Sequence, residues 1–315
     1  MKRLFAVVLL SVMAISAFAL KNNPAYRDAR RSGAIAKMQI HAIDDLGHGV
    51  PDADVNVFMG MNFRPKGYTI SGRTDANGVF VAEGKTCGDE INIEISKAGY
   101  YSSVKKLCFA EMGAEHDVSN GKWQPFGDNM IVALRRIMNP VDVIVLDKLI
   151  DVAQTNVWLG FDMEKKDFVK PAGNGLKSDF EVKVEWDGLP AWESKVCSAE
   201  IRFPEEKTGG YYVGNKSESA FPYAYEAQIG SAYQERSISI VDRDGDPHTT
   251  KVSFAKDSSF VTRTRAVVDE QGNIKSANYG SIRRVGIGPS RRGVALMRLS
   301  YIFNPTPNGT NLEPK

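Results

Sequence analysis

Three segments between residues 38 and 101 decide the fold of the first half of this chain: MQIHAIDDLGHGVPDADVNVF (38–58), GRTDANGVFV (72–81) and INIEISKAGYY (91–101). Apolar and polar residues alternate in each of them, which is the pattern of a strand with one buried face. Turn residues separate the runs, and Thr74–Gly78 is predicted to close a hairpin that leads into a strand from Val79. Short strands with turns roughly every 8–12 residues are typical of a β-sandwich.

Residues 38–107 also resemble the carboxypeptidase regulatory-like domain, a transthyretin-like β-sandwich. The matching positions are Asp45 and Gly47, then Pro51, Ala53 and Val55, then Gly72, Thr74, Asp75, Gly78 and Phe80, and finally Gly99 and Tyr100. The segment Gly60–Tyr68 is longer than in the family pattern. The resemblance implies an Ig-like sandwich over residues 35–138. It also implies a non-catalytic role, because these modules act as spacers or binding modules in secreted proteins. The second half resembles no family that we recognise.

The first 19 residues have the pattern of a secretory signal peptide. Lys2 and Arg3 precede an apolar run, and Ala17-Phe18-Ala19 is a small-x-small cleavage site. The apolar run is shorter than the ~20 residues that span a membrane. We therefore predict export to the periplasm, the cell surface or the extracellular space, and a bacterial origin. Residues 20–34 are polar and basic and are predicted to form a flexible arm.

Composition limits the classes of partner. The 315 residues carry a net charge of +2, which falls to zero without Lys2 and Arg3, so the overall charge gives no support for nucleic-acid binding. No segment after the signal is long and apolar enough for a membrane span. Cys87 and Cys108 flank one predicted strand, and two alternatives remain open for them: a disulfide, or two reduced cysteines.

Residues 159–310 are predicted to form a second β-rich domain, a sandwich or jelly roll. Phe180–Trp186 alternates cleanly, and Gly293–Phe303 is the longest apolar run of this half. Residues 139–158 are predicted to be a connector. Their apolar positions are closer to a helical period, which favours a short helix, whereas the β-branched run Val141–Val145 favours a strand. The predicted fold class is all-β.

We find no pattern that indicates a catalytic, cofactor or metal site. The four histidines are scattered without metal-ligand spacing, and no nucleophile elbow or phosphate loop is present. Carboxylates are abundant around Trp186, and paired carboxylates can hydrolyse glycosides without any local motif. No catalytic residue, cofactor or metal ligand is therefore predicted, and a hydrolase remains an alternative.

Aromatic residues of the second half are the best candidates for binding, because sugar rings stack on exposed aromatic faces. The candidates are Trp186, Trp192, Tyr223 and Tyr225, with Tyr223 and Tyr225 predicted on one face of a strand. The alternative is that they fill the core. The last quarter is also basic, and Arg263 and Arg265 are predicted to share a strand face, which would suit an anionic polysaccharide.

These observations together predict an exported, non-catalytic binding or structural protein with carbohydrate as its candidate ligand. A polysaccharide or another cell-surface component is the expected partner. The alternative is a polysaccharide-acting hydrolase that uses carboxylates of the second domain.

Overall fold

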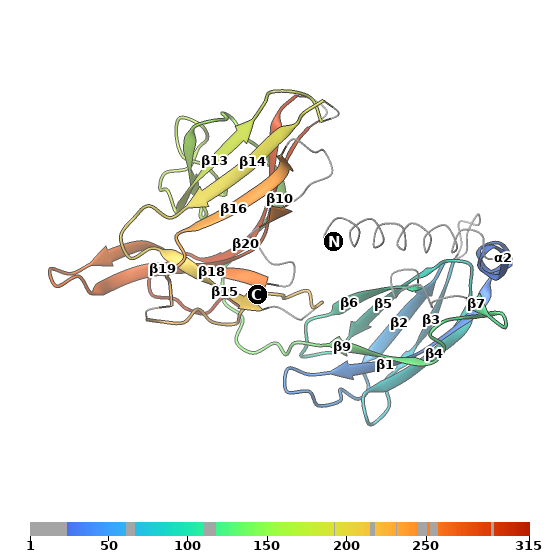
Figure 1. Ribbon diagram of the computed structural model, residues 1–315. Coiled ribbons are helices and arrows are strands. Elements are labelled where there is room, and N and C mark those ends of the chain that lie inside the picture. The colour runs from blue at the N-terminus through green and yellow to red at the C-terminus, as the bar shows by residue number, and fades with distance from the viewer. Residues whose placement is uncertain are drawn as a thin grey trace, which may run out of the picture. The chain divides into compact units, whose positions relative to one another are not determined.

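The computed structural model describes residues 24–60, 67–109, 118–191, 193–214, 218–230, 232–244, 251–252, 258–290 and 293–315 (Figure 1). The chain forms two compact units: unit 1 comprises Met1–Ile137 and Ser217–Phe221, and unit 2 comprises Met138–Lys216 and Pro222–Lys315. One helix is described, and the other elements are strands, which confirms the predicted all-β class. The predicted signal peptide lies outside the described residues.

Unit 1 is a sandwich of two sheets. In the first sheet, the inner strand β1 (Ala34–Ile43) pairs with β4 (Val79–Thr86), β8 (Lys122–Trp123) and β9 (Asp128–Ala133), and β7 (Val118–Ser119) pairs with β8. The second sheet has the order β3 (Tyr68–Arg73), β2 (Asp54–Met59), β5 (Glu90–Ser96) and β6 (Ser103–Cys108). Alternate residues such as Ile40, Val57 and Ile93 are fully buried between them.

The turn at Thr74–Gly78 does not close a hairpin, so that prediction is wrong. β3 pairs with β2 in one sheet, whereas β4 pairs with β1 in the other, and the turn therefore joins the two layers. Asp75 Oδ1 accepts the N–H groups of Asn77 and Val79, and the Ala42 N–H donates to the Gly78 carbonyl. Turn residues in the sequence mark a reversal of the chain but do not say which sheet receives the next strand.

Residues 24–32 form the helix α2 (Pro24–Ser32), so the flexible arm predicted for residues 20–34 is wrong in this part. Pro24 suits the first turn of a helix, where no N–H is needed. Gly33 has φ 85° and its N–H donates to the Ala29 carbonyl, which ends the helix in an αL cap. Ala29 is buried, and Tyr26 donates to Asp89 Oδ2 at 2.9 Å, so the helix docks on the sandwich.

A short segment from later in the chain completes unit 1. Ser219 bridges antiparallel to Ser103 of β6, the edge strand of its sheet. The Ala220 N–H donates to the Ser102 carbonyl at 2.7 Å, and the Val104 N–H donates to the Glu218 carbonyl at 3.2 Å. We call residues 218–220 the strap. It supplies hydrogen-bond partners to an edge on which no other described strand pairs.

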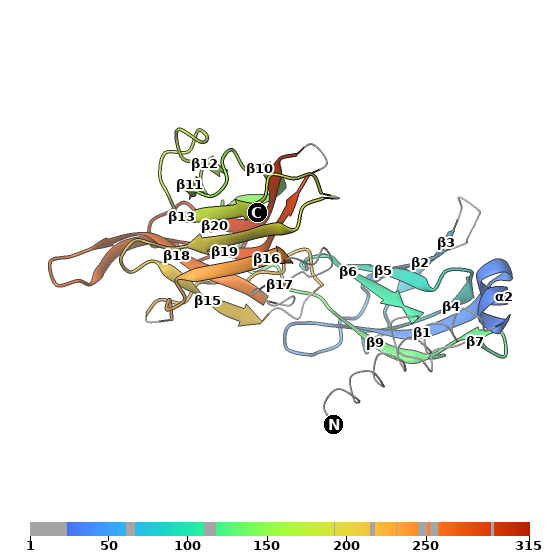
Figure 2. The same ribbon diagram turned by 45° about the horizontal axis from the view of Figure 1, so that its top comes forward.

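Unit 2 is also a two-sheet sandwich (Figures 1 and 2). One sheet has the order β10 (Ile144–Asp151), β20 (Ala295–Asn304), β19 (Ile274–Pro289), β18 (Ser258–Val268) and β15 (Gly209–Gly214). The other has the order β12 (Asp167–Phe168), β11 (Trp158–Asp162), β13 (Phe180–Trp186), β14 (Val196–Arg202), β16 (Ser237–Asp244) and β17 (Lys251–Val252). Both sheets contribute to one core, in which Phe161 of β11 stacks on Phe180 of β13 and packs edge-on against Tyr301 of β20.

The helix considered for residues 139–158 is absent, and the strand alternative holds. β10 pairs antiparallel with β20 from Ile144 opposite Phe303 to Asp151 opposite Leu296. This segment is part of a sheet of unit 2 and is not a connector. Its mixed period misled the prediction because this edge strand carries apolar residues on its exposed face, where Val145 and Leu149 lie, as well as on its buried face.

Candidate binding pocket

An open pocket of about 520 Å³ lies in unit 2, within the size range of small-molecule sites. Four separate parts of the chain line it: the β18–β19 hairpin, the segment at Ile229 and Gly230, Lys207 before β15, and Asn308 after β20. Three of its lining residues are basic, and no Asp or Glu occurs among the described residues that line it. The pocket is therefore electropositive.

Arg263 of β18 is the buried cation of this pocket, with 5% of its surface exposed. Its Nε donates to the Lys207 carbonyl at 2.7 Å, and its Nη1 donates to the Gly230 carbonyl at 3.0 Å. The guanidinium lies over the ring of Tyr233, with Cζ 4.2 Å from the ring centroid. Two carbonyls and one aromatic face therefore hold this guanidinium in a fixed orientation.

Three tyrosines pack against one another next to the pocket. Tyr233 contacts Tyr211 and Tyr279, with ring centroids 5.1 Å and 6.0 Å apart. Tyr233 donates to the Gln228 carbonyl at 2.7 Å, and the Gln228 N–H donates to the Tyr211 hydroxyl. Burial raises the pKa of Tyr233 above its ordinary value, and the neighbouring tyrosines add to the effect. The phenol therefore stays neutral and does not compensate the charge of Arg263.

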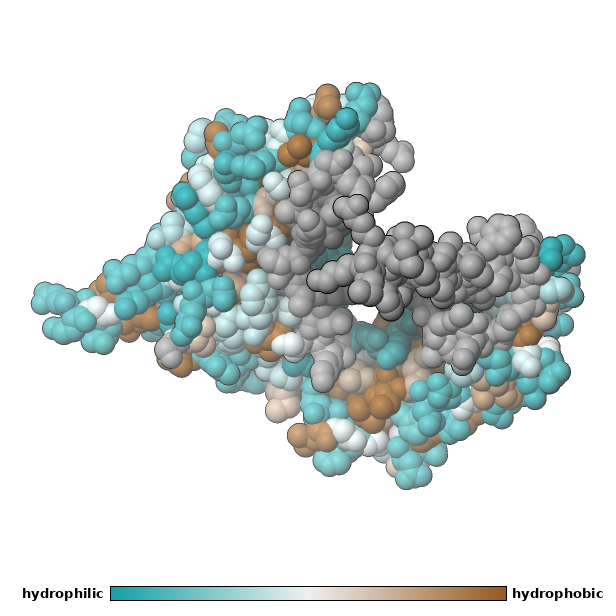
Figure 3. All heavy atoms as spheres, viewed as in Figure 1, coloured by the Kyte–Doolittle hydropathy of each residue, from teal (hydrophilic) through white to brown (hydrophobic). Residues whose placement is uncertain are grey.

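The other two cations are exposed at the pocket rim. Within the described part of the chain, neither Lys207 nor Lys275 forms an ion pair. In the turn of the hairpin, the carboxylate oxygens of Asp269 accept N–H groups from Gln271 and Asn273. Asp269 thus shapes the turn that carries Asn273 and Lys275. The far end of the β18–β19 hairpin is covered mainly by hydrophilic residues on the face that Figure 3 shows.

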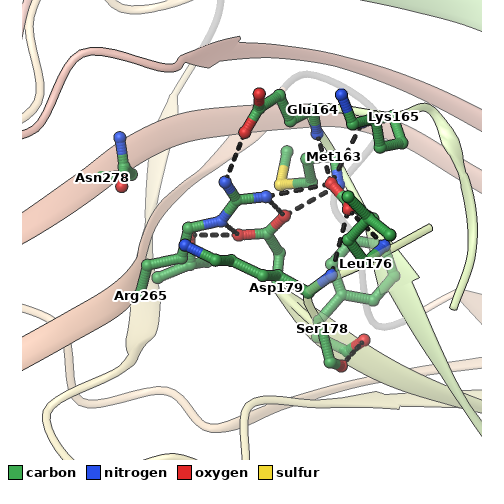
Figure 4. A network of polar contacts seen from close by, with 12 residues as sticks. Met163, Glu164, Lys165, Leu176, Ser178, Asp179, Arg265 and Asn278 are labelled. Carbon is green, nitrogen blue, oxygen red and sulfur yellow. Dashed lines mark hydrogen bonds and ion pairs between the residues drawn. The ribbon is translucent and has the colours of Figure 1, made fainter.

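A second polar cluster of unit 2 surrounds Arg265 (Figure 4). The guanidinium binds Asp179 through two parallel hydrogen bonds of 2.8 Å, and it also binds Asp162 at 2.9 Å and Glu164 at 2.6 Å. Thr264 Oγ1 donates to the same Asp179 carboxylate. Arg265 is therefore paired with three carboxylates, and two of them, Asp162 and Asp179, are buried.

The two buried carboxyls of this cluster differ in pKa. Burial raises the pKa of Asp179, although Arg265 opposes the effect. Burial alone would also raise the pKa of Asp162. The backbone N–H groups of Leu176, Lys165 and Lys177, together with Arg265, outweigh burial there and lower it. Every oxygen of both groups already accepts hydrogen bonds, which makes the cluster a structural clamp between β11, β13 and β18.

The prediction that Arg263 and Arg265 share a strand face is wrong. A bulge interrupts the pairing of β18 with β19 after Thr264, and Arg265 has φ 53°. Arg265 therefore binds Asp179 on the same side as Thr264, whereas Arg263 contacts Lys207 and Gly230 at the pocket. Positive φ at a residue other than glycine has no local sequence signal, so the alternating pattern could not show this change of face.

The three aromatic candidates that the structure describes, Trp186, Tyr223 and Tyr225, do not share an exposed strand face. Trp186 at the end of β13 is half-buried against the core and donates to the Leu189 carbonyl. Tyr223 is buried, with its hydroxyl 3.0 Å from Ser300 Oγ. Tyr223 and Tyr225 do not lie in a strand, contrary to the prediction. Trp192 lies outside the described residues.

Cys87 and Cys108 are not joined by a disulfide, so the structure has the reduced alternative. Cys87 is buried, and its Sγ lies 3.7 Å from the Arg31 carbonyl of α2. Among the described residues, no group of three or more His, Cys, Asp or Glu side chains is arranged to hold a metal ion. The same residues include no helix with the length and apolar character that crossing a membrane requires.

No protein-family model and no curated protein matches this sequence. Among solved structures, the chain is similar to 3-chlorocatechol 1,2-dioxygenase from Rhodococcus opacus 1CP, with 14% identity over 34% of this chain and 61% of that chain and a TM-score of 0.25. It is also similar to the shaft pilin spaA from Lactobacillus rhamnosus GG, with 8% identity over 75% of this chain and 89% of that chain and a TM-score of 0.23. The chain thus spans about three fifths of the dioxygenase. At these TM-scores neither likeness assigns an activity.

Proposed function

We propose that the chain is an exported, non-catalytic binding protein of the periplasm or the cell surface, and that unit 2 binds carbohydrate. The observation that carries the proposal is the open electropositive pocket, which has the volume of a ligand site and several polar groups that converge on it. In this proposal unit 1 is a carboxypeptidase regulatory-like module, and residues 1–19 direct export.

The alternative, a hydrolase, needs two carboxyl groups that face a sugar at ~5–10 Å from each other. Among the described residues of unit 2, three acids gather around one cation: Asp162, Glu164 and Asp179. All three bind one guanidinium, and the two buried ones also accept backbone or hydroxyl donors. Groups held in this way are poor candidates for proton transfer, because an acid must release its proton during each turnover. Their arrangement favours binding without hydrolysis.

The test uses the full chain on an array of neutral and acidic polysaccharides, with release of reducing sugar measured for every polysaccharide that binds. Binding without release supports the proposal. Release of sugar would replace it with the hydrolase alternative, and absence of binding to every polysaccharide would leave only a structural role. Sequencing of the protein exported from a bacterial host tests the signal peptide, since cleavage after Ala19 predicts Leu20 as the first residue.

A further inference from the structure

The buried guanidinium of Arg263 has unused hydrogen-bonding capacity. Arginine carries five N–H donors. Two of them reach the carbonyls of Lys207 and Gly230, and the described residues provide no acceptor for the other three. The described residues also provide no carboxylate within ion-pair distance of Arg263. A charge that is 5% exposed and lacks a counter-charge is costly, and a bound anion would reduce that cost.

Arg265 is a structural arginine of the same unit, and its partners differ from those of Arg263. It lies two residues away on the same strand and has three carboxylate partners, at 2.6–2.9 Å. Arg263 has none within the described residues, and its guanidinium borders a pocket instead of a carboxylate cluster. Lys207 and Lys275 add two exposed positive charges at the rim of the same pocket. The missing anion of this site is therefore expected to come from a ligand.

From this arrangement we infer that the pocket binds an acidic sugar, with the carboxylate of a uronic-acid unit paired to Arg263. The inference rests on the proposed function and adds its ligand class and site. A guanidinium matches a planar carboxylate through two parallel N–H···O bonds, and the donors on Nη1 and Nη2 that remain suit that geometry.

The rest of the pocket fits a sugar better than a small inorganic anion. Its volume of about 520 Å³ leaves room for a ring beside the anionic group. The amide nitrogens of Asn273 and Asn308 already donate to Asp269 and to the Lys275 carbonyl, and each keeps a second N–H for a sugar hydroxyl. The Ile229 side chain offers an exposed apolar face for the carbon skeleton. Neutral sugars lack the group that would pair with Arg263, which makes the charge the main source of specificity.

The experiment is calorimetric titration of the full chain with three probes: an oligogalacturonate, the neutral galactose oligosaccharide of equal length, and inorganic sulfate. The variant K207Q/K275Q changes exposed rim residues and should fold normally. Its control, K148Q/K195Q, makes the same change of net charge at exposed lysines of unit 2 outside the pocket. R263Q tests the buried cation, with circular dichroism as the check on folding.

We expect the uronate to bind at least tenfold more tightly than the neutral sugar and than sulfate. K207Q/K275Q should weaken uronate binding at least tenfold, K148Q/K195Q should change it less than twofold, and added salt should weaken it in the wild type. Equal binding of the neutral sugar or of sulfate, or an unchanged affinity in K207Q/K275Q, would overturn the inference. Binding of neutral polysaccharides alone on the array would refute the acidic ligand and keep the proposed function. Binding of none would refute both.

Discussion

Arg265 and Asp179 face each other through two parallel hydrogen bonds of 2.8 Å, Nε to Oδ1 and Nη2 to Oδ2. Asp179 is buried and directly precedes β13, whereas Arg265 lies at the bulge of β18. This pair therefore joins the two sheets of unit 2. Buried ion pairs contribute little compared with an apolar core, but the loss of one partner is costly because the other charge stays buried.

We predict that R265M destabilises unit 2 by about 3–5 kcal/mol at neutral pH, because it leaves Asp162 and Asp179 without their cation. Burial then raises the pKa of Asp179 further, because only the hydrogen bonds from the Met163 N–H and the Thr264 hydroxyl still oppose it. A raised pKa in the folded state means that the variant regains stability as pH falls below it and loses stability as pH rises through it. Urea denaturation from pH 5 to 8 measures this. K183M removes an exposed ion pair with Glu185 and should cost less than about 1 kcal/mol. A similar cost for both variants would contradict the clamp.

Asp187 should support the β13–β14 turn through its ionised carboxylate. Partial burial alone would raise its pKa, but N–H groups of Lys195, Leu189 and Val196 lower it to about 2. D187N should therefore cost about 1 kcal/mol near pH 7, a value reduced by solvent screening at this exposed site. Because the pKa of Asp187 is lower in the folded state than its unfolded value of 3.8, the ionised carboxylate stabilises the fold above pH 3.8. This stabilisation is lost as pH falls from 3.8 toward 2. Denaturation curves of the variant and the wild type should converge near pH 2, and a constant gap would argue against this account.

Gly78 should be far less tolerant of a side chain than Gly47, although both have positive φ, at 78° and 84°. A Cβ at Gly78 would lie 2.6 Å from the Ala42 carbonyl oxygen and the Val50 nitrogen, whereas nothing lies within 4 Å of one at Gly47. G47A should cost about 1–2 kcal/mol from backbone strain alone. G78A should cost at least about 2 kcal/mol more because backbone atoms must move. Thermal denaturation of the two variants compares them directly, and equal values would mean that the turn can shift.

Helix α2 should depend on Asp89, which accepts hydrogen bonds from Tyr26 and Arg30. D89A should raise amide hydrogen exchange in residues 24–32 about tenfold, because charged hydrogen bonds contribute ~1.5–3 kcal/mol. E90A is the matched control, because it removes the carboxylate next to Asp89 in the sequence, and Glu90 pairs with Lys106 of β6. Unchanged exchange in D89A would show that the apolar contacts of α2, such as the Tyr26–Trp123 ring pair, are sufficient.

The strand pattern of the sequence was the most reliable predictor of the fold. Alternation located β2, β5 and β13, because each buries one face and exposes the other. It failed for α2, a short and mainly polar helix whose apolar face consists of Ala25, Tyr26 and Ala29 alone. Its signals were the flanking residues, Pro24 at the start and Gly33 just past the end.

The pocket could not be predicted from local patterns. Lys207, Arg263 and Asn308 lie far apart in the sequence, and only the sandwich brings them to one pocket. Alternation along the basic last quarter predicted one shared face for Arg263 and Arg265, but the bulge assigns Arg265 to the clamp and Arg263 to the pocket. Of the aromatic candidates, Tyr223 packs inside unit 2, as large rings often do in β-sandwiches.

The strap makes the order of synthesis important for unit 1. Residues 218–220 are translated about 85 residues after the end of β9, and no other described strand pairs with the edge of β6 until then. A truncated product ending near residue 137 would keep both sheets of unit 1 but present an open strand to other chains. A gene fragment that ends at the boundary between the two halves would therefore encode an aggregation-prone protein. A recombinant form of unit 1 needs the strap as a fused or separate peptide.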